Sequence, residues 1–183
     1  MNKALTSIAV RYGLIAAAIS VAYSLIAYLV DLSLFANAWM GILLWILGLV
    51  IIIVAVVQAK KSQGGFITFK DAFGTFMISY LLNAAIATTF IILLFNVIDT
   101  DAAEKVKEMT IEATVNMMEK FNTPEDAIDK AIENAEATNQ FDFINQLRGF
   151  LFGIIFYAIV GLIVAAIVKK NPVYTDDSLD SEI

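Results

Sequence analysis

Four long stretches without a charged side chain constrain the fold of this chain more than any other feature. They occupy residues 12–30, 32–59, 72–98 and 149–168, and each is 19 to 28 residues long. An α-helix of about 20 apolar residues spans the hydrocarbon core of a bilayer, which is about 30 Å thick. Four such stretches in 183 residues leave too little polar sequence to cover them in a soluble protein. The sequence therefore predicts four membrane-spanning helices, at about residues 9–30, 39–59, 70–98 and 146–168.

The composition excludes several kinds of chemistry. The chain has no histidine and no cysteine, so it offers no imidazole base, no thiolate nucleophile and no cysteine ligand for zinc or iron–sulfur clusters. None of the four stretches contains Asp, Glu, Lys or Arg, and such side chains inside a span usually mark proton or ion pathways. We therefore expect no catalytic, metal-binding or cofactor-binding residues and a protein that is not an enzyme.

The distribution of lysine and arginine predicts the orientation, because cytoplasmic loops carry an excess of both. Basic residues flank the first stretch at its start, fill the second connection and follow the fourth stretch, whereas residues 31–38 have none. They are Lys3, Arg11, Lys60, Lys61, Lys70, Lys169 and Lys170. Both termini are thus expected in the cytoplasm, with residues 171–183 as an acidic cytoplasmic tail, and residues 99–145 are expected outside.

The connection at 99–145 is predicted to be an extracytoplasmic helical hairpin. Its first part carries two apolar stripes at helical spacing, and a second helix is expected to begin with Thr123 as its N-cap and Pro124 in its first turn. Two interpretations stay open: the stripes pack on each other and on the membrane surface, or the second stripe contacts another protein. The first stripe comprises Val106, Met109, Ala113, Met117 and Phe121, and the second, the candidate partner-facing set, comprises Ile111, Val115 and Met118.

Polar and small residues inside the stretches are candidates for helix packing. Asn83 is the strongest hydrogen-bonding group in the third stretch; it either holds helices together or contacts a substrate or lipid headgroup. The fourth stretch has small residues at four-residue spacing, which favour close packing within the bundle or, alternatively, dimerisation. They are Gly149, Gly153, Gly161 and Ala165. Thr68 and Asp71 resemble a capping box that opens the third helix.

Four diffuse motifs together resemble a known family. They are residues 11–13 (RYG), residues 69–73 (FKDAF), Ile98-Asp99 before an acidic helical segment, and residues 169–172 (KKNP). The pattern is similar to the uncharacterised bacterial membrane family catalogued as domain-of-unknown-function family 4199. The resemblance implies a four-helix protein of the bacterial inner membrane with its hairpin in the periplasm, and it supplies no catalytic or binding residues.

The fold expected from these observations is all-α: a four-transmembrane-helix bundle with an extracytoplasmic hairpin between helices three and four. The leading functional hypothesis is a non-enzymatic accessory or scaffold subunit of a larger inner-membrane assembly. The alternative is a small oligomeric carrier or channel for a neutral or lipid-like solute. The expected partners are the lipid bilayer and other membrane protein subunits. Association of the chain with copies of itself stays open as an alternative. The net charge of −6 argues against nucleic acid, which is bound through clustered Lys and Arg.

Overall fold

A computed structural model describes residues 2–171, and the expected acidic tail lies outside these residues apart from Asn171. Four of its helices are long and apolar enough to cross a membrane, and in the described part of the chain the only strand-like feature is an isolated β-bridge. The all-helical fold with four candidate spans is thereby confirmed. The long helices are α1 (Lys3–Val30), α3 (Ala38–Ser62), α4 (Phe69–Leu93), which continues into the π-helical turn η1 (Leu94–Ile98), and α7 (Phe143–Val168).

Two helices begin at least three residues earlier than the sequence predicts. α1 begins at Lys3 rather than near residue 9, because the side chain of Asn2 caps it by accepting a hydrogen bond from the Leu5 amide at 3.0 Å. α7 begins at Phe143, three residues before the expected start. At α4 the expected capping residue is confirmed: the Thr68 hydroxyl accepts from the Asp71 amide at 3.1 Å and donates to the Asp71 carboxylate at 3.0 Å.

α4 is the central helix of the bundle, since it packs against α1, α3 and α7. Close approach of α1 requires a glycine: a Cβ added at Gly13 would lie 2.8 Å from the Ser79 carbonyl oxygen. The main apolar core forms between these helices, toward the end at which the chain begins, which we call the amino-terminal end. Its buried members are Leu5, Ile52, Val56, Ala59, Ile67, Ala72, Phe76, Tyr80 and Ala165.

Contacts between loops close the amino-terminal end. Ile67 and Lys170 pair in the β-bridge, with both backbone hydrogen bonds at 3.0 Å, and the Lys60 ammonium donates to the Val168 carbonyl at 2.8 Å. Gly64 and Gly65 make the turn between α3 and α4, with φ of 71° and 89°, where other residues would be strained. The end of α7 is therefore held against the α3–α4 connection.

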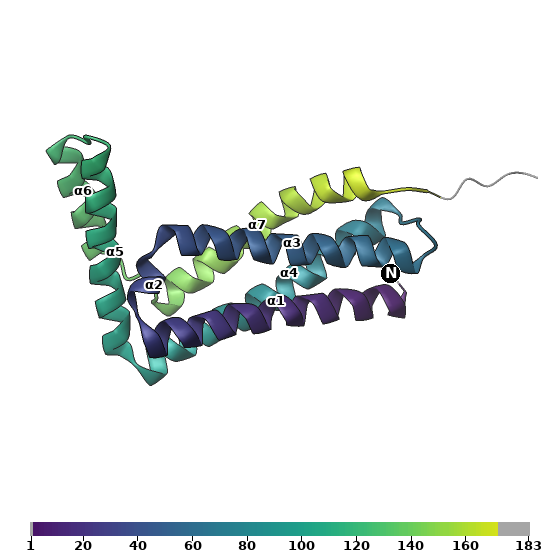
Figure 1. Ribbon diagram of the computed structural model, residues 1–183, viewed down its shortest axis with the longest axis horizontal. Helices are drawn as coiled ribbons and strands as arrows, with labels where there is room; N and C mark the ends of the chain where they lie inside the picture. The colour runs from purple at the N-terminus through teal and green to yellow at the C-terminus, as the bar shows by residue number, and fades with distance from the viewer. Residues whose placement is uncertain (1, 172–183) are drawn as a thin grey trace, which may run out of the picture.

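At the opposite end, which we call the α5 end, three shorter helices cover the bundle. Figure 1 shows α5 and α6 lying side by side and crosswise to the long helices. A second apolar cluster joins α5 to the bundle; its buried members are Leu94, Phe95, Ala102, Ala103, Val106 and Phe141. The shorter helices are α2 (Ser33–Ala36), α5 (Thr100–Lys120) and α6 (Glu125–Glu136).

The expected N-cap of α6 is wrong. α6 begins at Glu125 after Pro124, which occupies the N-cap position and has no side-chain cap bond. Thr123 instead closes α5: its amide donates to the Met118 carbonyl at 3.0 Å, next to Asn122 in the left-handed region at φ 53°. Thr123 therefore lies one position before the N-cap of α6.

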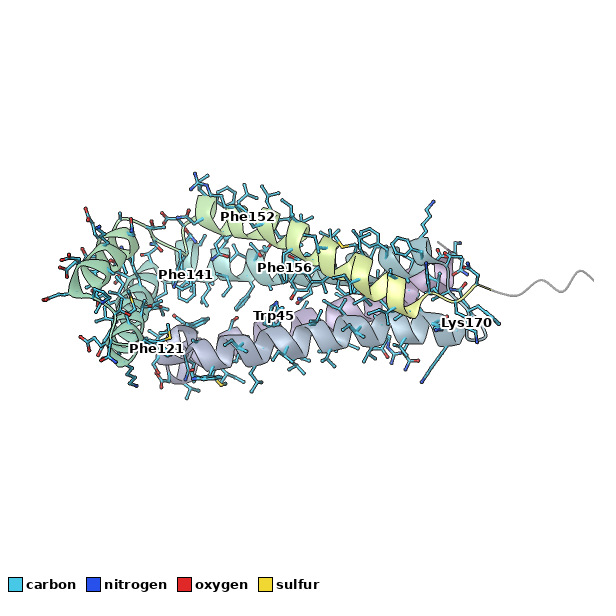
Figure 2. All side chains as sticks on the ribbon, turned by 90° about the horizontal axis from the view of Figure 1, so that it is seen from above. Trp45, Phe121, Phe141, Phe152, Phe156 and Lys170 are labelled. Atoms are coloured by element: carbon cyan, nitrogen blue, oxygen red, sulfur yellow. The ribbon has the colours of Figure 1, made fainter. Side chains whose placement is uncertain are left out.

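α3 and α7 are close at the amino-terminal end and separate toward the α5 end, as Figure 2 shows from above. Trp45 and Phe156 face each other between them, with ring centroids 6.3 Å apart. Beyond this pair, the first half of α3 has no buried residue. In the half of the bundle nearest α5, both helices therefore carry exposed apolar side chains.

Candidate interaction surfaces

Asp99 fixes the direction of α5. One of its carboxylate oxygens accepts from the Ala102 amide at 2.9 Å and the other accepts from the Tyr28 hydroxyl of α1 at 2.9 Å. The hydrogen bond from Ala102, and next that from Tyr28, lower the pKa of Asp99 below its usual value. The ionised carboxylate thus caps the helix and also ties it to the bundle.

The π-helical turn before Asp99 makes the corner. The Asp99 amide donates to the Leu94 carbonyl at 2.9 Å, five residues back, which closes the wide turn that ends the α4 stretch. In the same turn, Asn96 donates to the Phe141 carbonyl at 2.8 Å and so holds the segment that leads into α7. The two contacts place α5 and α6 across the end of the bundle.

A groove of about 750 Å³ runs between α5 and the start of α3. Its two aromatic residues are largely exposed: Trp39 is 79% exposed and Phe121 is 78% exposed. Figure 2 places Phe121 at this end, next to the beginning of α3. The charged and polar side chains Glu112, Asn116 and Lys120 also line the groove. Its apolar lining comes from both helices and includes Trp39, Ile42, Met109, Ala113, Met117 and Phe121.

The two apolar stripes of α5 have different surroundings. Ile111, Val115 and Met118, the candidate partner-facing residues, are all partly buried. On their side of the helix, Lys107 donates to the Glu136 carbonyl at the end of α6 at 2.8 Å. Met117, from the first stripe, is 49% exposed and lies in the groove with Phe121. The more open apolar surface of α5 thus belongs to the first stripe.

Sequence reasoning identified Met117 and Phe121 as members of a stripe but did not single them out. Their spacing gives no sign that the start of α3 lies beside them. That placement depends on the corner at residues 94–99, whose π-helical geometry has no recognisable signal in the sequence.

Two of the small residues of α7 allow close contact with α4. A Cβ added at Gly161 would lie 2.7 Å from the Phe76 ring, and one added at Gly153 would collide with the Tyr80 hydroxyl. Ala165 is fully buried, whereas an added Cβ at Gly149 would meet nothing within 4 Å. Tyr80 also stacks on Tyr157 of α7, with centroids 3.9 Å apart.

Asn83 lies where α1 and α4 meet. Its side-chain oxygen accepts from the Ser20 hydroxyl of α1 at 3.2 Å, and the buried Ser79 hydroxyl nearby in sequence donates to the Ala9 carbonyl of α1 at 3.0 Å. Asn83 and Thr88 line neither the groove at α5 nor the open face of α1. The contacts of Asn83 therefore link helices. In residues 2–171 no group of three or more acidic side chains is placed to hold a metal ion.

Comparison with known proteins identifies one family. The family model described as "Protein of unknown function (DUF4199)" matches residues 11–170. No curated protein matches the chain. No solved structure matches it either.

Proposed function

The chain belongs to this family of proteins of unknown function, and from its own surfaces we propose that it is a non-enzymatic accessory or scaffold subunit of a larger assembly. In this proposal the protein lies in a bacterial inner membrane, with both termini in the cytoplasm. α5 and α6 form an extracytoplasmic hairpin that lies along the membrane surface. The protein contacts its partner through this hairpin and through its spans.

The groove between α5 and the start of α3 carries the proposal. Phe121 lies outside the four candidate spans, directly after a helix that is rich in charge, yet it is 78% exposed. With Met117 and Trp39 it lines the groove, and exposed apolar patches rimmed by polar residues mark contact sites. The matching partner is an apolar segment of another membrane protein, located where its span meets the surface.

The separation of α3 and α7 supports partner contact within the membrane. In this half of the bundle, α7 exposes Leu151, Phe152 and Ile155, and α3 exposes Ile42 and Trp45, so both present large side chains outward. Gly149 has open space beside it, which permits a close backbone approach by a further helix. A partner span packed here would continue from the groove along the bundle.

A pull-down from native membranes in mild detergent tests the proposal, with quantitative mass spectrometry of the proteins that co-elute. We expect a stoichiometric partner with the wild type, and its loss with Phe121→Lys, because a charge then sits in the apolar contact. Asn134→Lys is the matched control, since it adds the same charge at an exposed position of α6. Charging Ile111 or Met118 is less selective, because both are partly buried and would disturb the packing of α5.

Two results would contradict the proposal. One is a partner that binds Phe121→Lys and the wild type equally. The other is a clean homo-oligomer without a further protein. The second result favours the alternative, a small carrier for a neutral or lipid-like solute, and a solute-uptake assay on Asn83→Ala then becomes the deciding measurement.

A further inference from the structure

We propose that the exposed face of α1 at the amino-terminal end binds one anionic phospholipid, whose phosphate contacts Lys3, Ser7 and Arg11. The face is open and is formed by the side chains of this one helix. Its polar half holds two cations and two hydroxyl groups, and its apolar half continues along the same side of the helix. The lining residues are Lys3, Thr6, Ser7, Val10, Arg11, Leu14, Ile15 and Ala18, and all of them are exposed.

The spacing of the polar residues suits one headgroup. Lys3, Ser7 and Arg11 follow at four-residue intervals, which places them on one side of the helix over about 12 Å. Both cations are long enough to turn toward a phosphate bound between them, near the Ser7 hydroxyl. Guanidinium and ammonium groups together with a hydroxyl donor are a common set of ligands for a phosphate oxygen.

The side chains of Lys3 and Arg11 have no partner among the described residues. Within residues 2–171, Lys3 and Arg11 take part in no ion pair or side-chain hydrogen bond. Two other lysines of the same end differ: Lys60 donates to the Val168 carbonyl, and Lys170 lies over the Phe66 ring at 5.3 Å. The start of α1 itself is closed by Asn2, so the anion is held by side chains rather than by free backbone amides.

The length of α1 places these residues at the level of lipid headgroups. Its 28 residues extend about 42 Å, whereas the hydrocarbon core is about 30 Å thick. Counting about 20 residues back from Val30 reaches Arg11, so Arg11 lies at the hydrocarbon boundary and Lys3 lies among the headgroups. In the headgroup layer, the negative charge that can pair with Lys3 and Arg11 is that of an anionic lipid.

The apolar half of this face favours a lipid over a free phosphate ion. Leu14 and Ile15 are 48% and 40% exposed, and with Ala18 they continue the face from Arg11 into the hydrocarbon layer. An acyl chain attached to the bound phosphate covers these side chains, whereas an inorganic ion leaves them uncovered. The site therefore combines a charged headgroup contact with an apolar chain contact on one helix face.

Native mass spectrometry of the full chain tests the proposal. The protein is released from nanodiscs of phosphatidylglycerol and phosphatidylethanolamine, and the retained lipids are counted. We expect phosphatidylglycerol to be enriched over the supplied mixture. The double variant Lys3→Gln/Arg11→Gln should lower this enrichment by roughly thirtyfold, the combined factor for two cations near an anionic surface. Lys61→Gln/Lys70→Gln is the matched control, since it removes the same charge from exposed positions of the same end.

The proposal fails if the Lys3/Arg11 variant retains as much phosphatidylglycerol as the wild type, or if the control loses as much as that variant. It also fails if inorganic phosphate displaces the lipid at equal concentration, because the acyl chain then adds nothing. Circular dichroism checks that each variant folds. Binding of spin-labelled phosphatidylglycerol to the wild type, with and without salt, gives a second measure of the preference for the anionic lipid. A negative result leaves the proposed partner groove untouched, because that groove lies at the α5 end.

Discussion

At the scale of single residues, glycines on the same helix have very different surroundings. Gly161 faces the fully buried ring of Phe76, whereas Gly149 faces open space. The spacing of small residues in the sequence treats the two positions alike. The difference arises because α7 packs on α4 along most of its length but leaves the bundle near its start.

We expect Gly161→Ala to lower the free energy of unfolding by about 1–3 kcal/mol, the usual cost of overfilling a packed contact. The added Cβ would lie 2.7 Å from Phe76 and 3.3 Å from Phe73, and Phe76 has no free space to move into. Gly149→Ala should leave the free energy unchanged or raise it slightly. Reversible unfolding in mixed micelles measures both, and equal effects of the two substitutions would contradict the packing described here.

Asp99 makes the position of α5 sensitive to pH. The pKa of its carboxyl is lowered in the folded protein, so its stabilising contribution is present above the unfolded pKa, which is about 3.9. The contribution is lost as the pH falls from there through the lower folded pKa, because protonation removes the charge that caps α5.

Hydrogen–deuterium exchange of residues 99–106 checks this dependence by comparing wild type with Asp99→Ala at each pH. The intrinsic pH dependence of exchange cancels in the ratio of the two rates. We expect the variant to exchange faster near neutral pH and the ratio to fall toward one below about pH 4. A ratio that stays constant across this range would show that the ionised carboxylate does not hold α5.

At the scale of elements, local signals set the ends of some helices, and long-range contacts set their direction. The cap of α4 is readable in the sequence because Thr68 and Asp71 are three residues apart. The direction of α5 is not, because Tyr28 and Asp99 are 71 residues apart. At Thr123 the local signal fails: the Thr123 amide closes α5, and Pro124 takes the N-cap position of α6.

Thr68→Ala should lower the free energy of unfolding by about 1 kcal/mol, because the Asp71 amide then loses its acceptor at the start of α4. Thr68→Ser keeps the hydroxyl and should retain most of the stability. Unfolding of the two variants in the same mixed micelles makes the comparison. A serine variant as unstable as the alanine variant would assign the effect to the lost methyl group.

At the scale of the whole molecule, the two ends of the bundle differ in both charge and structure. The amino-terminal end holds Lys3, Lys60 and Lys170, together with the bridge that closes it. The α5 end holds the acidic helices, since residues 99–148 carry a net charge of −7. Because basic loops stay in the cytoplasm, the two ends are expected on opposite sides of the membrane.

Single cysteines test this orientation cleanly, because the chain has none of its own. Glu133→Cys lies on the exposed face of α6, and Ser62→Cys lies at the exposed end of α3. We expect a membrane-impermeant maleimide to label the first in right-side-out vesicles and the second in inverted vesicles. Labelling in the reverse pattern would place α5 and α6 in the cytoplasm.

The sequence by itself determined the number of candidate spans, the all-helical class, the family and the cap of α4, because each of these depends on apolar length or on residues a few positions apart. Only the tertiary structure decided that α5 and α6 lie crosswise, that Met117 and Phe121 meet the start of α3, and that α7 separates from α3. These features depend on contacts between distant residues, such as Tyr28 with Asp99 and Asn96 with Phe141. Periodicity places a residue on a face of its helix, but only packing decides what that face meets.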